Sequence, residues 1–116
     1  MRTTLAVGIG LILLLAAACG SSTMPANSCG SSGASANISA SDGLTFAPKN
    51  ATITHGQAVC WQNNGSLAHT VTSDDGTSFN TSLPTGQIFV RTFSTAGSFP
   101  YHCTIHADMI GTITVN

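Results

Sequence analysis

The sequence has very few charged residues and no glutamate. Lysine and arginine together number three and aspartate four among 116 residues, so 6% of the chain is charged and the formal net charge is -1. A protein that binds a nucleic acid neutralises phosphates with many clustered lysine and arginine side chains. The composition therefore argues against a nucleic acid as a partner.

The chain is also short, and it has few of the residues that favour long helices. A length of 116 residues suits one small domain and leaves no room for a two-domain enzyme. Threonine, serine, valine, isoleucine, asparagine and glycine are prominent instead, and these residues favour strands joined by tight turns. We therefore expect an all-β domain.

Residues 1–18 are expected to be a signal peptide and not part of the fold. Arg2 gives a positive start, and the apolar run 5–18, which is too short for an ordinary membrane-spanning helix, leads into Cys19. The stretch LLLAAACGSS resembles a bacterial lipoprotein signal, whose cysteine carries the lipid, although Ala16 stands where a larger aliphatic residue is more common. Ordinary secretory cleavage is the alternative. Both interpretations place the domain in the periplasm or at the cell surface, and the first anchors it to a membrane through Cys19.

Residues 19–36 are expected to form a flexible tether. They are rich in glycine, serine and alanine and show no hydrophobic period. Cys29 lies in this tether, and an oxidising compartment permits disulfides among the four cysteines of the chain. If Cys19 is lipidated and Cys103 binds a metal, only Cys29 and Cys60 remain to pair; two separate thiols are the alternative.

Short strand patterns separated by turn signals fill residues 37–116. In one of them Val59 and Trp61 lie on one face and Cys60 on the other, and the turn sequence NNGS follows. The spacing predicts about seven or eight strands in a β-sandwich or barrel, with antiparallel and some parallel pairing. Four aromatic residues are expected in the core or packed at its pole: Phe46, Trp61, Phe93 and Tyr101.

The segment YHCTIHADM, residues 101–109, has the spacing of a metal-binding loop. Cys103, His106 and Met109 follow one another at intervals of three, and a loop can gather them around one point, whereas a strand would spread them by about 3.3 Å per residue. His69 begins a strand just after a turn, and such strand ends gather at one pole of a sandwich. Two imidazoles, a thiolate and a weak axial thioether are the ligands of blue-copper electron-transfer sites.

Two other histidines are expected to lie outside this metal site. On a strand, the His102 side chain points away from that of its neighbour Cys103. His55 lies in the turn sequence THGQ. Neither residue is therefore expected to be a ligand.

From its first strand to its C-terminus the chain resembles the cupredoxins, the type 1 blue copper proteins, of the plastocyanin and amicyanin type. The resemblance rests on VCWQNNGSLAHTVTSDDG, on TFSTAGSFPYHCTIHADMIGTITV and on the order His, Cys, His, Met, and the CxxHxxM spacing is similar to the short loop of amicyanin. It implies a Greek-key β-sandwich over 37–116 that holds one copper ion. The implied equatorial ligands are His69, Cys103 and His106, with Met109 as the weak axial ligand.

Some residues near the expected site depart from this family pattern. Ala68 precedes His69 where proline is common, and Thr70 follows it where asparagine is frequent. The Thr70 backbone amide or hydroxyl is therefore expected to supply the hydrogen bond near the cysteine sulfur. Asp108 places a negative charge beside the expected exposed edge of His106. Three interpretations are open: the charge tunes the docking of a partner, it stabilises the oxidised site, or Asp108 is simply a solvated turn residue.

The resemblance implies an electron carrier and not an enzyme, with copper cycling between Cu(I) and Cu(II) and unidentified redox proteins as partners. The alternative is a copper carrier or storage protein, which would use methionine-rich or histidine-rich segments, and beyond the signal peptide only Met24 and Met109 are present. A copper oxidase or nitrite reductase would need a second metal site and a longer chain. A binuclear copper centre is excluded, because it requires a second cysteine in the ligand loop.

Overall fold

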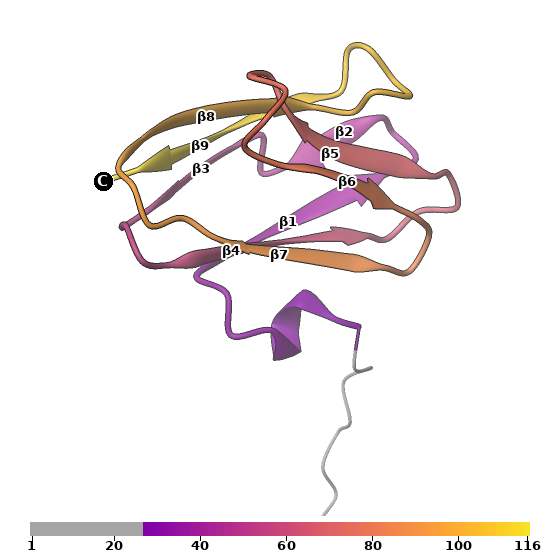
Figure 1. Ribbon diagram of the computed structural model, residues 1–116. Coiled ribbons are helices and arrows are strands. Elements are labelled where there is room, and N and C mark those ends of the chain that lie inside the picture. The colour runs from indigo at the N-terminus through magenta and orange to yellow at the C-terminus, as the bar shows by residue number, and fades with distance from the viewer. Residues whose placement is uncertain (1–26) are drawn as a thin grey trace, which may run out of the picture.

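The computed structural model describes residues 27–116, which form nine strands and one short helical turn (Figure 1). The predicted signal peptide and Cys19 lie outside the described residues. The elements are η1 (Cys29–Ser31), β1 (Ala36–Ser41), β2 (Thr45–Ala47), β3 (Asn50–Ile53), β4 (Ala58–Asn63), β5 (His69–Ser73), β6 (Asn80–Leu83), β7 (Ile88–Thr92), β8 (Gly97–His102) and β9 (Ile110–Val115). No helix in this part of the chain is long and apolar enough to cross a membrane.

The strands form two sheets that pack face to face. One sheet has the order β2-β1-β4-β7, and the other has the order β3-β9-β8-β5-β6. The pairs β1–β4 and β3–β9 are parallel, whereas the remaining neighbours are antiparallel. The predicted all-β sandwich with mixed pairing is therefore confirmed.

The structure has more strands than the seven or eight that the sequence predicts, for two reasons. The segment around Pro48 reads as one interrupted strand, but β2 pairs in the first sheet and β3 in the second, so the chain changes sheet there. Strand β6 is a four-residue edge strand that pairs only with β5. Its sequence, NTSL, has no strong strand pattern, so the pairing with β5, and not local sequence preference, stabilises the extended backbone here.

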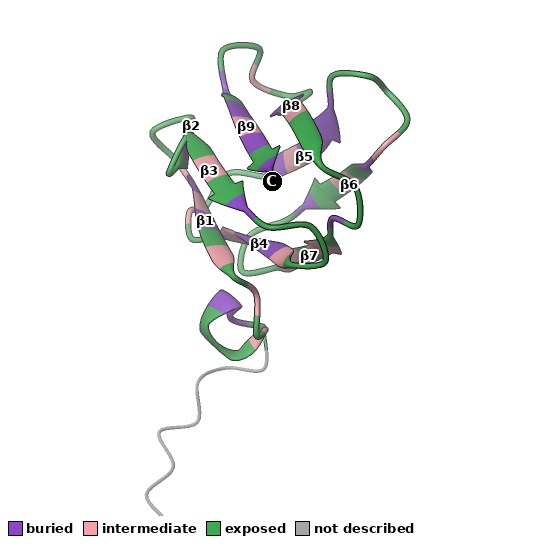
Figure 2. Cartoon of the chain, turned by 90° about the vertical axis from the view of Figure 1, so that its left-hand side faces the viewer, coloured by how far each residue is buried: buried purple, intermediate pink, exposed green. Residues whose placement is uncertain are grey.

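Trp61 lies at the centre of an aromatic core between the sheets. Its side chain is fully buried, and its ring meets Tyr101 edge-on and Phe89 in a stacked arrangement, each at a centroid distance of 5.4 Å. Figure 2 shows buried and exposed segments alternating along the strands of both sheets, as expected when each sheet covers the core with one face. Phe46 and Phe93 are also buried, so all four predicted core aromatics are confirmed.

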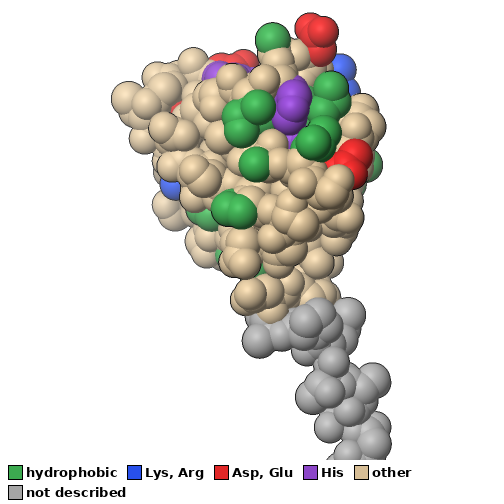
Figure 3. Space-filling model, turned by 90° about the vertical axis from the view of Figure 1, so that its right-hand side faces the viewer, with side chains coloured by type: hydrophobic (Ala, Val, Ile, Leu, Met, Phe, Trp, Pro, Cys, Tyr) green, Lys and Arg blue, Asp and Glu red, His purple; other side chains and the backbone are tan. Residues whose placement is uncertain are grey.

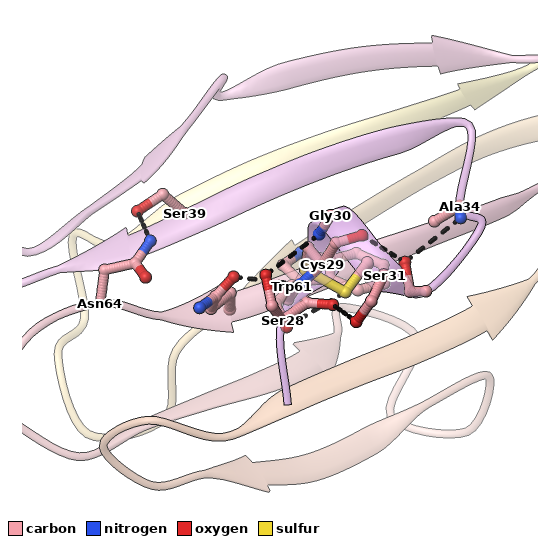
Figure 4. The surroundings of a disulfide bond; sticks show 11 residues. Ser28, Cys29, Gly30, Ser31, Ala34, Ser39, Trp61 and Asn64 are labelled. Carbon is pink, nitrogen blue, oxygen red and sulfur yellow. Dashed lines mark hydrogen bonds between the residues drawn. A yellow bond between two sulfur atoms is a disulfide. The ribbon is translucent and has the colours of Figure 1, made fainter. Parts of the chain in front are cut away.

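A disulfide joins the N-terminal segment to the outer face of the first sheet. Cys60 points away from the Trp61 core, yet it is buried because η1 lies over it, and it is bonded to Cys29 (Figure 4). The Cys29 backbone N–H also donates to the Gln62 side chain at 3.1 Å, and the Ser35 N–H donates to the Ala58 carbonyl at 2.9 Å. The predicted pairing of Cys29 with Cys60 is thus confirmed.

The same contacts correct the predicted boundary between tether and domain. We expected residues 19–36 to be a flexible tether, but residues 28–35 are attached to β4, and β1 already begins at Ala36. The composition of this segment is that of a linker, and the disulfide supplies the attachment that its few apolar side chains cannot. The folded domain therefore begins at about Ser28.

Replacing both Cys29 and Cys60 by alanine should lower the free energy of unfolding. The disulfide closes a loop with a sequence separation of 31, and a chain-entropy estimate for a loop of this length gives about 4 kcal/mol. Urea unfolding of the metal-free protein, compared with the variant, measures the difference. Equal midpoints for the two proteins would show that the disulfide contributes nothing to stability.

Candidate metal centre

The loop between β8 and β9 is compact because its own backbone closes it. Strand β8 ends at His102 and β9 begins at Ile110, two residues that face each other in the antiparallel register. The Cys103 N–H donates to the Met109 carbonyl at 2.9 Å, and the Met109 N–H donates to the His106 carbonyl at 3.0 Å. Three predicted ligands are therefore held on one closed loop.

His69 reaches this loop through the pairing of β5 with β8. His69 is the first residue of β5, and Thr72 of the same strand lies opposite His102. The next strand, β6, supports β5 from the other side, with Leu83 opposite His69. Two segments that lie 34 residues apart in the sequence consequently meet at one end of the sandwich.

The donor atoms of His69, Cys103 and His106 converge. The two Nδ1 atoms of His69 and His106 lie 3.3 Å apart, and the Cys103 Sγ lies 3.6 Å from the His106 Nδ1. All three donor atoms lie within 4.8 Å of one another, and no other group of three or more histidine, cysteine or acidic residues within 27–116 could hold a metal ion in this way. His69 and Cys103 are buried, whereas His106 is only partly covered.

The surroundings of His69 favour the neutral imidazole, which is the form that binds metals. Burial lowers the pKa of His69, and the neighbouring His106 lowers it further because two positive charges would repel. The Asp42 carboxylate and the Ser41 backbone carbonyl act in the opposite direction. The net shift is downward, so His69 is ready to donate its nitrogen lone pair near neutral pH.

A hydrogen bond reaches the cysteine sulfur from the residue after His69. The Thr70 backbone N–H donates to the Cys103 Sγ at 3.4 Å, and the Thr70 hydroxyl accepts from the Thr104 N–H at 2.8 Å. Of the two groups expected near the sulfur, the backbone amide is therefore the one that contacts it. The hydroxyl instead ties the strand of His69 to the ligand loop.

Cys103 is a buried free thiol, and Met109 is buried at the end of the same loop.

Position 111, just after this loop, requires a glycine. A Cβ at Gly111 would lie within 3 Å of the Tyr101 ring, at 2.8 Å from its Cε1 atom. The absence of a side chain there lets β9 pass directly over the buried tyrosine.

The histidines predicted to lie outside the site take no part in this cluster. The His102 Nδ1 lies 2.6 Å from the Asp74 Oδ1, and the His55 Nδ1 lies 3.0 Å from the Asn116 carbonyl oxygen. Asp108 is exposed at a hollow that Lys49 and Ile110 also line. No ion pair of Asp108 is found within residues 27–116.

Two residues that support His69 were not expected from the sequence. The Asp42 carboxylate accepts hydrogen bonds from the loop between β4 and β5, and the buried Asn63 side chain donates to the Leu67 carbonyl of the same loop. The only local signal is that Asp-Gly and Asn-Asn-Gly are turn sequences. Such a signal predicts a turn but not which other turn it will contact.

The family model described as copper binding proteins, plastocyanin/azurin family, matches residues 33–116. Among curated proteins, the plastocyanin of Scenedesmus fuscus is 34% identical over an aligned length of 93 residues, and the match covers 65% of this chain and 90% of the plastocyanin. The match to the family model includes the ligand loop, the strand of His69 and the whole of the second sheet, because all of them lie within 33–116.

Solved structures show the same fold. A purple cupredoxin from Nitrosopumilus maritimus has a TM-score of 0.65 and 30% identity, and the match covers 70% of this chain and 99% of that protein. The Cu(I) form of an amicyanin mutant has a TM-score of 0.62 and 25% identity over 72% of this chain and 83% of amicyanin. A copper-containing nitrite reductase from Thermus scotoductus matches over only 22% of its own length, with a TM-score of 0.63 and 26% identity. The chain therefore belongs to the copper-binding plastocyanin/azurin family, the cupredoxins, whose members carry electrons by means of copper.

Proposed function

We propose that this protein is an exported blue copper protein that carries single electrons between redox partners. Its copper ligands are His69, Cys103 and His106, with Met109 as a weak axial ligand. The observation that carries the proposal is the convergence of two imidazole nitrogens and one thiol sulfur at a buried end of the sandwich.

The spacing of the donor atoms fits a single metal ion. Zinc, a first-row ion of similar size, binds imidazole nitrogen at about 2.0–2.1 Å and thiolate sulfur at about 2.3 Å. Donors at such bond lengths and near-tetrahedral angles lie about 3.3–3.6 Å from one another, in line with the separations of 3.3 Å and 3.6 Å that the two donor pairs involving His106 show. The third pair, His69 and Cys103, lies within 4.8 Å. Two imidazoles and a thiolate, with a thioether nearby, form a set that suits copper in particular.

The protein holds these ligands in one arrangement. When bound, a copper ion in this ligand set supplies a one-electron couple between Cu(I) and Cu(II). The closed loop holds Cys103 and His106, the β5–β8 pairing holds His69, and the Thr70 N–H fixes the direction of the sulfur. Because these contacts do not depend on the charge of the ion, the ligands need to move little when that charge changes.

Partners dock on the exposed side chains around His106. Four large hydrophobic residues are exposed on the loops and strand ends near the ligand loop, and we call them the apolar rim: Leu44 (39% exposed), Leu67 (44%), Ile105 (56%) and Ile110 (45%). Figure 3 shows hydrophobic side chains gathered around a histidine on this face. Since His106 is the one ligand that is not fully buried, the apolar rim brings a partner close to it.

A carrier of electrons fits the described residues better than a copper enzyme does. Residues 27–116 form one candidate metal centre, whereas a copper reductase would need a second. The protein acts outside the cytoplasm, in the periplasm or at the cell surface, with the signal peptide 1–18 directing export and Cys19 as the lipid anchor. Support for this placement comes from the sequence pattern alone, because residues 1–18 and Cys19 lie outside the residues that the structure describes.

Copper-loaded protein should show an intense visible absorption band, which arises from charge transfer between the Cys103 thiolate and Cu(II). The variant Cys103→Ser should lose this band, since serine offers no thiolate. Visible and paramagnetic resonance spectra of the protein with one equivalent of copper provide the measurement. A colourless copper complex, or a band that survives Cys103→Ser, would contradict the proposed site.

The same copper-loaded protein distinguishes an electron carrier from a copper carrier. Reversible voltammetry with slow loss of copper supports electron transfer. Rapid transfer of Cu(I) to a metal-free acceptor protein would instead support the copper-carrier alternative.

The variant Ile105→Asp should slow electron self-exchange between oxidised and reduced copies by about tenfold or more. Self-exchange requires two apolar rims to meet, and two like charges placed face to face there cost more than the 1.4 kcal/mol that corresponds to a factor of about ten. Line broadening in mixtures of the two oxidation states measures the rate. Val90→Asp is the matched control, because Val90 is similarly exposed (41%) but lies on β7, away from the ligand loop. Equal effects of both substitutions would show that the apolar rim is not the contact surface.

A further inference from the structure

We propose that Asp42 is a positioning residue for the copper site, which acts by holding the loop that leads into His69. The inference rests on the proposed function, because it takes His69 to be a copper ligand. Asp42 lies in the turn between β1 and β2, in the first sheet, whereas His69 begins β5 in the second sheet. The residue therefore acts across the end of the sandwich and not through its own strand.

The Asp42 carboxylate accepts a dense set of hydrogen bonds from the β4–β5 loop. The Ser66 N–H donates to Oδ1 at 2.8 Å and to Oδ2 at 3.0 Å, and the Ser66 hydroxyl donates to Oδ2 at 2.7 Å. The Leu67 N–H donates to Oδ1 at 3.0 Å. These bonds fix the backbone up to two residues before His69, so the direction in which the chain enters β5 depends on Asp42.

The two turns are in direct contact, and a glycine makes this contact possible. A Cβ at Gly65 would lie 2.9 Å from the Asp42 backbone nitrogen and closer still to its carboxylate. Any larger residue at position 65 would therefore push the carboxylate away from Ser66 and Leu67. The close approach therefore depends on one residue in each turn: Asp42 supplies the carboxylate, and Gly65 leaves the space for it.

Asn63 holds the same loop from the interior. Its buried side chain donates to the Leu67 carbonyl at 2.7 Å and to the Leu83 carbonyl at 2.9 Å, and it accepts from the Gly65 N–H at 2.9 Å. Leu67 is thus held through its carbonyl by Asn63 and through its N–H by Asp42. With both contacts in place, the loop has little freedom to move His69 relative to Cys103.

Asp42 also places a negative charge near the ligand. Hydrogen bonds from the loop lower the pKa of Asp42, so the group is ionised at neutral pH, and its charge acts on the His69 imidazole. A negative charge stabilises the more positive, oxidised form of a metal centre. Removal of the charge should therefore raise the reduction potential, a change that a merely structural contact would not produce.

Asp75 provides a matched control within the same chain. Its carboxylate also lies in an exposed turn and accepts hydrogen bonds from two backbone N–H groups, those of Thr77 and Ser78, and from the Ser73 and Ser78 hydroxyls. These bonds close the turn between β5 and β6, which carries no candidate ligand. Asp75→Ala therefore removes a comparable set of bonds without loosening the loop of His69.

The experiment compares copper-loaded wild-type protein with Asp42→Ala, Asp42→Asn and Asp75→Ala. For each we measure the rate of copper loss to a chelator, the reduction potential and the unfolding midpoint of the metal-free form. Residues that orient metal ligands typically change metal affinity by about 10- to 100-fold when replaced, so Asp42→Ala should lose copper about 10- to 100-fold faster. Asp42→Asn should retain copper nearly as well, since its amide oxygen still accepts from the backbone, but both Asp42 variants should show a raised potential. Asp75→Ala should lower the unfolding midpoint only.

Equal copper loss from Asp42→Ala and Asp75→Ala, or wild-type potentials in both Asp42 variants, would overturn the proposal. If Asp42→Ala does not fold, Ser66→Ala replaces it, because that variant removes only the hydroxyl donor; unchanged copper loss from Ser66→Ala would then overturn the proposal. Failure of the proposed function looks different, since the wild-type protein itself would then lack the thiolate-to-copper band.

Discussion

The pairing of β5 with β8 is the constraint on which the candidate metal centre depends. Thr72 faces His102 and Ser73 faces Tyr101, and this register sets His69 beside the loop that begins at Cys103. A shift of one residue would turn His69 to the other face of the sheet, because side chains alternate along a strand. The remainder of the fold can be understood as support for this register.

The core supplies much of that support. Tyr101 is fully buried next to Trp61 and Phe46, and it fills the space that Gly111 leaves open on the adjacent strand. Tyr101 immediately precedes the strand end at His102, so the packing of its ring fixes the position from which the ligand loop starts. Hydrophobic packing therefore sets the geometry of the metal centre, although no core aromatic residue is itself a candidate ligand.

The low charge of the chain fits the surface that surrounds the centre. The apolar rim near His106 carries four exposed hydrophobic side chains, and an apolar surface gives short-range contact without strong electrostatic preference for one partner. The few carboxylates are used locally instead. Asp42 and Asp75 each hold a turn, and Asp74 pairs with His102.

The ligand loop was the part of the site most readily predicted from sequence. Cys103, His106 and Met109 lie on one short segment, so their spacing alone indicates that they can meet. His69 was predicted from its place at the start of a strand together with the family resemblance. The extent of the tether was predicted wrongly, because composition describes residues 28–35 in isolation whereas the disulfide to Cys60 attaches them to the domain.

The amino-acid sequence by itself determined the fold class, the aromatic residues of the core and the short spacing of Cys103, His106 and Met109. These features follow from patterns within single strands or loops, and local backbone geometry governs them. The tertiary structure decided that Asp42 reaches the loop before His69, that the Thr70 amide reaches the sulfur, and that β6 completes the second sheet. Each of these depends on contact between segments distant in the chain, and such contacts arise only when both sheets pack around the same core.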